Sequence, residues 1–234
     1  MDLPPLHNGR ILERYKRFLA DIELENGQVI TAHCPNTGSM TTCWAPGAKV
    51  QVSYSDNPKR RLAWTLERVN MGRGWVGVHT GRVNAVIADA IGNGQITSLT
   101  GYRRITAEPH FVVEGYPRSR FDLHLTDGPN LDAYIEIKNT TLLDGDCIRF
   151  PDAITERGRK HLQLLLEAVI RGWRGVIIFA VNRPEGRAFE PAWEIDPDYS
   201  ETLEIVAQLG VEVLATRLRH TDTGIEVVGV NGLE

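Results

Sequence analysis

The chain of 234 residues is 42% hydrophobic and 24% charged, which argues against a disordered or fibrous protein and fits one or two folded domains. No apolar run approaches the ~18 residues of a membrane span, and the first residues lack a signal-peptide core, so a cytoplasmic protein without membrane contact is expected. Three cysteines without a Cys-x-x-Cys pair argue against a disulfide framework and give little support to a zinc site.

The net charge of −4 hides an uneven distribution of charged residues. From Glu185 to the end there are 11 acidic and 3 basic residues, so the first 184 residues carry about +4 and the tail about −8. The basic residues of the first part are clustered, for example at 14–17, 59–61 and 157–160. Several such clusters together indicate a track for phosphate groups, whereas one alone is typical of a solvated face.

Short strands separated by turn residues are predicted along the first eighty residues, at 10–24, 28–34, 49–53, 64–70 and 75–79. Five short strands with Gly and Pro turns predict an OB-like β-barrel over residues 1–80, a fold that often binds single-stranded nucleic acid. A polar loop at 33–41 interrupts the strands. Its hydroxyl, amide and backbone N–H groups suit phosphate contact, and a plain connection is the alternative.

A second domain is predicted over residues 81–234. It starts with a helix at 83–91, for which Thr80 or Asn84 is a possible cap, followed by a strand region at 102–113. After a central hairpin come an amphipathic helix at 152–171, a buried strand at 174–182, a helix at 199–209, and strands at 211–219 and 225–230. The strand, helix, strand order implies a crossover and an α/β (α+β) fold with a mixed sheet.

The central hairpin, at 118–138, carries alternating polar and apolar residues on both sides of a turn at Asp-Gly-Pro-Asn. If the apolar residues of both strands share a face, Asp122 lies opposite Glu136 and Arg120 opposite Lys138. Two carboxylates and a lysine would then project from one polar face. The alternative is an ordinary half-exposed hairpin with a charged surface.

The two like-charged carboxylates on this face predict a bound cation. Two neighbouring carboxylates repel unless a cation lies between them, and Mg²⁺ or Mn²⁺ suits carboxylate oxygens. A neighbouring lysine stabilises a developing anion or orients the attacking water. Asp122, Glu136 and Lys138 are therefore the candidate catalytic residues of metal-dependent phosphodiester hydrolysis.

Five ordered blocks carry a family resemblance: RYKRFLAD from residue 14, HCPNTGSM from 33, SDNPKR from 55, YIEIK from 134 and FPDAITERG from 150. The chain closely resembles the sugar fermentation stimulation protein (SfsA) family. The resemblance implies an OB-like N-terminal domain, a C-terminal domain similar to PD-(D/E)xK nucleases, and binding of DNA without marked sequence preference. The family name also suggests a regulatory link to sugar metabolism.

Carried over by position, the family's nuclease-like site falls on Asp122, Glu136 and Lys138, with Asp89 as a third metal ligand beside Asp122 and Glu136. Arg159 stands where relatives tend to have Gln, which places a charge near the possible site. The candidate nucleic-acid-binding residues are Arg14, Lys16, Arg17, Asn36, Thr37, Ser39, Lys59, Arg60, Arg61, Arg120, Arg157 and Lys160.

Three functions remain open from the sequence. The preferred hypothesis is a DNA-binding protein with a divalent-metal site of endonuclease type. The second is a DNA-binding regulator, linked to sugar metabolism, that cuts nothing. The third is a carbohydrate-acting enzyme that uses Asp122 and Glu136 as a proton-shuttling pair.

Overall fold

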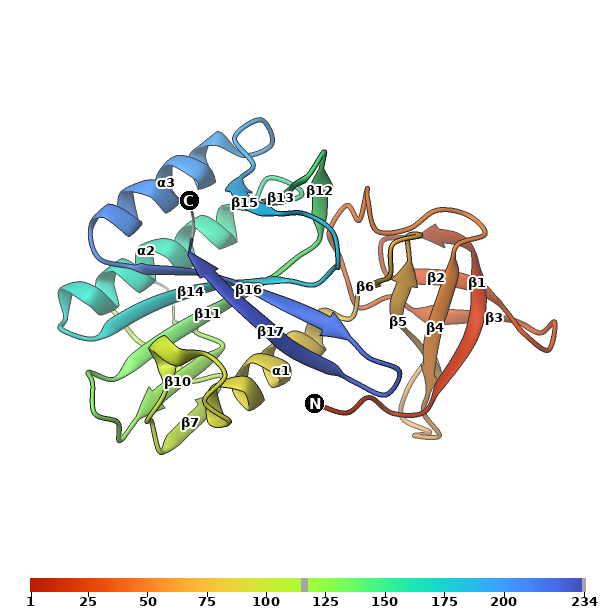
Figure 1. Ribbon diagram of the computed structural model, residues 1–234, viewed down its shortest axis with the longest axis horizontal. Helices are drawn as coiled ribbons and strands as arrows, with labels where there is room; N and C mark the ends of the chain where they lie inside the picture. The colour runs from red at the N-terminus through yellow and green to blue at the C-terminus, as the bar shows by residue number, and fades with distance from the viewer. Residues whose placement is uncertain (115–117, 233–234) are drawn as a thin grey trace.

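The computed structural model describes residues 1–114 and 118–232, and Figure 1 shows a barrel beside a layered α/β domain. The barrel strands are β1 (Leu6–Tyr15), β2 (Leu19–Leu24), β3 (Val29–His33), β4 (Lys49–Tyr54), β5 (Trp64–Asn70) and β6 (Trp75–Gly77). They form a sheet in the order β3-β2-β1-β4-β5-β6, and a parallel pairing of β3 with β5 closes the first five into a barrel. The predicted OB-like barrel is confirmed.

The barrel has one strand more than predicted at its start. Residues 10–24 do not form a single strand, because the chain turns between Tyr15 and Leu19, which pair across β1 and β2. Lys16 and Arg17 in this turn have φ angles of 50° and 65°, in the left-handed region that non-glycine residues seldom adopt. The turn contains no Gly, Pro or Asn, so no local signal marked it.

The second domain is built on a mixed sheet in the order β17-β16-β14-β11-β10-β7. These strands are β7 (Arg104–Ala107), β10 (Leu123–Thr126), β11 (Ala133–Thr140), β14 (Arg174–Val181), β16 (Glu212–His220) and β17 (Ile225–Gly232). Helix α1 (Thr80–Gly92) packs on one face, while α2 (Glu156–Ile170) and α3 (Pro197–Gln208) pack on the other (Figure 1). The strands β11 and β14 are parallel and joined through α2, which confirms the predicted crossover.

Both faces of this sheet are covered by apolar side chains. Val176 and Ile178 of β14 pack with α1, whereas the alternate residues Ile177 and Phe179 pack with α2 and α3. A strand buried on both faces reads as a continuous apolar run, as β14 does. The second face of the central hairpin is therefore directed at a helix layer rather than at open water.

The hairpin register is as predicted, since Leu123 pairs with Ile135. The expected pairing of Arg120 with Lys138 is wrong. A short strand β9 (Ser119–Arg120) instead pairs with β8 (His110–Phe111), because the chain leaves the main sheet before β10 begins. A further small sheet of β12 (Leu142–Asp144), β13 (Cys147–Phe150) and β15 (Ala188–Pro191), and a 3₁₀ turn η1 (Thr97–Leu99), were not predicted.

The helix starts differ from the sequence expectations. His79 precedes α1 and provides no side-chain cap, and the Thr80 hydroxyl donates to the Pro35 carbonyl at 2.7 Å instead. Helix α2 begins at Glu156, four residues later than predicted, where Thr155 caps it by accepting the Gly158 N–H at 3.0 Å. Among the described residues, no helix combines the length and apolar character needed to cross a membrane.

Several contacts join the barrel to the second domain. Arg68 of β5 donates to the carbonyls of Thr221 and Asp222 at 2.7 and 3.3 Å. At the chain start, the Leu3 N–H donates to the Thr223 carbonyl at 2.8 Å. The segment after β16 is thus held by both the barrel and the first residues of the chain.

Candidate metal and nucleic-acid site

Asp122, Glu136 and Lys138 come together where β10 starts beside β11. Asp122 immediately precedes β10, and its Oδ2 accepts the backbone N–H of Ile137 at 2.7 Å, beyond the last paired residues of the two strands. Glu136 and Lys138 share the face of β11 that lies towards α2, and Lys138 Nζ donates to Glu136 Oε1 at 2.6 Å. Asp122 thus lies across the hairpin from Glu136, but its hydrogen bonds go to Ile137 and Asn84, and its interaction with Glu136 and Lys138 is electrostatic.

Two residues from the helices complete this cluster. Asn84 of α1 donates through Nδ2 to Asp122 Oδ1 at 2.7 Å, and His161 of α2 lies with Nδ1 2.5 Å from Glu136 Oε1. From the sequence, Asn84 is predicted only as a possible helix cap, and His161 is not predicted as a site residue, because it falls on the apolar side of its helix. The signal that would find them is one polar residue on the sheet-facing side of each helix.

The two carboxyl groups have opposite electrostatic environments. Burial, together with the charge of Glu136, raises the pKa of Asp122. Burial also opposes ionisation of Glu136, yet Lys138 and His161 outweigh it and lower the pKa of Glu136. Lys138 and His161 thus favour the ionised form of Glu136, and a hydrogen bond from His161 to Glu136 requires the proton to be on Nδ1.

The structure does not bring Asp89 to the other two carboxylates. Asp89 lies five residues after Asn84, about 140° around the helix from the side that meets Asp122. Its carboxylate is half exposed and lies 3.4 Å from the Met1 amine. Within residues 1–114 and 118–232, no group of three or more His, Cys, Asp or Glu side chains is placed to hold a metal ion.

Arg14 and the polar loop at 33–41 form one unit. Arg14 Nη2 donates to the carbonyls of Arg17, Asn36 and Gly38 at 2.7, 3.0 and 3.0 Å. The Asn36 side chain accepts the Gly38 N–H at 2.9 Å. Arg14 and Asn36 thus hold the loop in shape, and phosphate contact by either residue stays a prediction.

The same loop, together with Thr42 directly after it, contacts the second domain. Ser39 Oγ and the Met40 N–H donate to Asp152 Oδ2 at 3.2 and 3.3 Å, just ahead of α2. Thr42 donates to the carbonyl of Thr141, which follows β11, at 3.3 Å. The loop therefore spans the chain segments that lead into α2 and out of β11.

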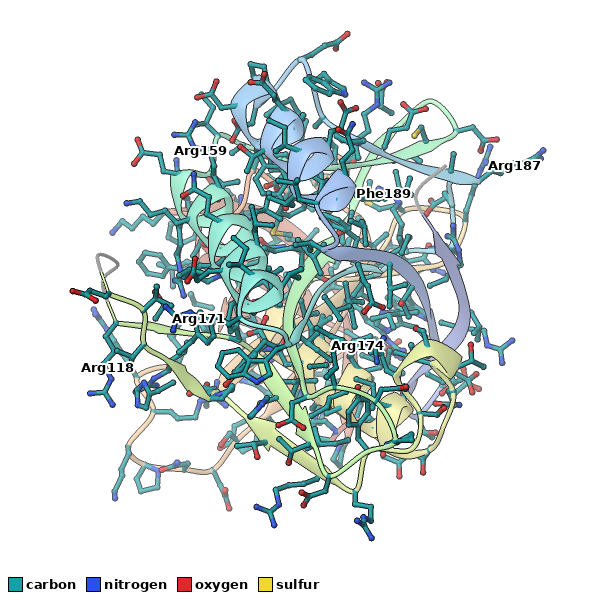
Figure 2. The ribbon with its side chains drawn as sticks, turned by 90° about the vertical axis from the view of Figure 1, so that its left-hand side faces the viewer. Arg118, Arg159, Arg171, Arg174, Arg187 and Phe189 are labelled. Carbon is teal, nitrogen blue, oxygen red and sulfur yellow. The ribbon has the colours of Figure 1, made fainter. Side chains whose placement is uncertain are left out.

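The remaining basic candidates are on the surface in two regions. In the barrel, Lys16, Arg60 and Arg61 line one groove, with Arg17, Thr37 and Lys59 also exposed. In the second domain, Arg157 and Lys160 are exposed on α2, whereas the exposed Arg120 pairs with Glu108 at 3.2 Å. Figure 2 shows Arg159 near the start of α2, where it pairs with Asp198 of α3, so its charge is directed to the helix pair.

Comparison with known proteins agrees with this two-part architecture. The profile described as the SfsA N-terminal OB domain matches residues 12–78, and the profile described as the sugar fermentation stimulation protein RE domain matches residues 81–224. The chain belongs to the sugar fermentation stimulation protein (SfsA) family.

Relatives in this family cover nearly the whole chain. The sugar fermentation stimulation protein homologue of Geobacter sulfurreducens is 49% identical over 228 residues, 97% of this chain and 96% of the relative. The homologue of Shewanella baltica is 45% identical over 225 residues, with 96% and 95% covered. The SfsA structure from Pyrococcus furiosus, described as a complex with Ca²⁺, aligns with a TM-score of 0.88 at 25% identity and covers 100% of this chain and 98% of that one.

Proposed function

We propose that this SfsA-family chain binds DNA with little regard to sequence and hydrolyses phosphodiester bonds with Mg²⁺ or Mn²⁺. The observation that carries the proposal is the electrostatic coupling of Asp122 to Glu136 and Lys138 where β10 starts beside β11, with Lys138 hydrogen-bonded to Glu136. The Pyrococcus furiosus relative in complex with Ca²⁺ supports a divalent cation, since Ca²⁺ and Mg²⁺ both take oxygen ligands.

The donor set fits a hard cation of this kind. Mg²⁺ is commonly bound by one or two carboxylates, with water and substrate phosphate completing its coordination. Burial, and after it the charge of Glu136, raises the pKa of Asp122, so part of the rise reflects repulsion between the two carboxylates. A cation between them would relieve that repulsion. Two carboxylates without a cysteine, and with His161 already bonded to Glu136, do not fit zinc.

Each side chain then has a defined task. Asp122 and Glu136 would hold the cation, which, when bound, supplies positive charge to the phosphoryl group and promotes ionisation of water. Asn84 and His161 fix the orientation of the two carboxylates through one hydrogen bond each. Lys138 would leave Glu136 for the phosphate oxygen, where its charge offsets the negative charge that builds up during cleavage.

The test is a cleavage assay on supercoiled plasmid and circular single-stranded DNA in Mg²⁺, in Mn²⁺ and in EDTA. Cleavage is expected with metal and not with EDTA, and it should be lost in Glu136→Gln and Lys138→Met. Asp89→Asn is the matched control, because that carboxylate is exposed and remote from the cluster, and it should cut as wild type does. Metal-dependent cleavage that survives in Glu136→Gln would place the chemistry elsewhere.

A DNA-binding protein that cuts nothing is the second candidate, and one observation favours it. Lys138 donates to Glu136, and both oxygens of Asp122 already accept hydrogen bonds, so the resting cluster is satisfied by the protein itself. In that case the wild type binds DNA in Mg²⁺ without cleaving it, and Glu136→Gln binds equally well.

A further inference from the structure

A groove of about 480 Å³ opens on the barrel, between the β1–β2 turn, strand β3 and the loop joining β4 to β5. Lys16 lines it from the turn, and Arg60 and Arg61 line it from the loop. None of its described lining residues is acidic. Its size lies in the range of about 300–1,000 Å³ that is usual for small-ligand sites, and its charge suits an anion.

Apart from Thr31 and His33, the rest of the groove lining is apolar. Phe18, Leu19 and Leu62 line it, and 47% of the Phe18 surface is exposed. Phe18 packs on no other aromatic ring among the described residues, unlike the aromatic cluster around Tyr134 in the second domain. An exposed ring beside three cations matches a ligand that has both a flat apolar face and negative charge.

Both rims of the groove are fixed before a ligand arrives. In the turn, Lys16 and Arg17 are held at positive φ, a conformation that glycine would adopt with less strain. In the opposite loop, Lys59 N–H donates to Asn57 Oδ1 at 3.0 Å, and the Arg60 guanidinium donates to Thr65 Oγ1 at 2.5 Å. Ordered rims reduce the conformational entropy that binding would otherwise cost.

We propose that this groove binds an unpaired nucleotide, with its base against Phe18 and its phosphates between Lys16 and Arg61. Stacking on an aromatic ring needs a free base face, which a single strand offers and an intact duplex hides. The protein should therefore prefer single-stranded to duplex DNA. This inference rests on the proposed DNA binding and names its substrate class.

The experiment measures fluorescence anisotropy of a labelled oligothymidylate and of a labelled duplex of equal length, in EDTA so that cleavage plays no part. Phe18→Ala should weaken single-strand binding about tenfold or more and leave duplex binding unchanged. Phe18→Trp should restore it. Trp193→Ala, which removes a ring exposed at 42% in the second domain, is the matched control and should change nothing.

A second variant distinguishes a loss of binding in the groove from a loss of protein stability. Lys16→Gly removes a cation and also the strain of its positive φ, so its melting temperature should equal or exceed that of wild type. Its affinity should nonetheless fall for single strands, and the slope of log affinity against log salt should decrease by about 1. Unchanged affinity in Lys16→Gly would overturn the role of this rim.

The other outcomes are distinguishable. Equal weakening of duplex and single-strand binding by Phe18→Ala would overturn base stacking in the groove, as would tighter binding of duplex by the wild type. Competition by free thymidine monophosphate at the affinity of the strand would assign the groove to a mononucleotide and overturn the single-strand proposal. Absence of all DNA binding would instead refute the proposed function itself.

Discussion

Acidification is expected to weaken the contact between the two domains through one histidine, His220 at the end of β16. Its Nε2 lies 2.7 Å from Asn182 Oδ1, and its Nδ1 lies 3.5 Å from Arg68 Nη1. The amide oxygen needs a donor and the guanidinium needs an acceptor, so the ring fits as the neutral tautomer with the proton on Nε2. Burial and the charge of Arg68 lower the pKa of His220 to about 4.

The magnitude follows from linkage. In the unfolded chain a histidine has a pKa of about 6.5, so between about pH 6.5 and pH 4 the unfolded state binds one proton that the folded state does not. Stability is fully present above pH 6.5 and is lost as the pH falls towards 4. At about 1.4 kcal/mol per pH unit, the loss reaches at most about 3 kcal/mol. A proton on His220 Nδ1 would face the guanidinium of Arg68, and the two positive charges would repel each other across the contact between β16 and the barrel strand β5.

The assay is urea unfolding at several pH values from about 7 to about 4.5, for wild type and His220→Gln. Glutamine keeps an amide donor and an acceptor but takes up no proton, so the pH dependence should be smaller in the variant by up to about 3 kcal/mol. His7→Gln, at an exposed position of β1, is the control and should retain the wild-type slope. Identical slopes in wild type and His220→Gln would refute the reasoning.

Three further predictions concern the carboxylate cluster and its surroundings. Asp122→Asn should fold in EDTA, but it should lose the gain in melting temperature that a divalent cation gives wild type. That gain is about 5–10 °C when the cation concentration is about a hundred times its dissociation constant. An equal gain in the variant would exclude Asp122 as a ligand. Arg14→Met should lower the unfolding free energy by about 1–3 kcal/mol, because four carbonyls lose a donor, and urea unfolding with exposed Arg17→Met as control would show it. Equal stability of the two variants would contradict the role of Arg14 in the loop. Tyr199→Phe should be as stable as wild type or up to about 1 kcal/mol more stable, because the buried hydroxyl has no hydrogen-bond partner among the described residues; a loss in calorimetry would reveal a partner for it.

The pairing of Asp122 with Glu136 was predictable from the sequence, because side chains alternate between the two faces of each strand. The apolar residues of the two strands share a face only if Asp122 lies opposite Glu136 or opposite a residue an even number of positions away. The position of the turn then selects the register with Asp122 opposite Glu136. The same local patterning indicated the barrel strands and the buried run of β14. These features lie within a few residues of the signals that specify them.

The surroundings of the pair were decided by packing between distant segments. Asn84 and His161 reach the carboxylates because α1 and α2 pack on the two faces of the sheet, and Asp89 misses them because it lies on another side of α1. The sequence indicates Arg14 as a free surface cation, whereas in the structure its guanidinium is hydrogen-bonded to the loop at 33–41.

The sequence by itself determined the strand patterns, the hairpin register and the two-part architecture, since each follows from periodicity and turn chemistry along a short stretch. Only the tertiary structure decided which polar residues face water and which face another element. Alternation shows that a side chain leaves the apolar face, but what it meets depends on segments far away in the chain. Lys16 and Arg17 mark the same limit, because the tight β1–β2 hairpin holds them at positive φ, a conformation that their side chains do not favour.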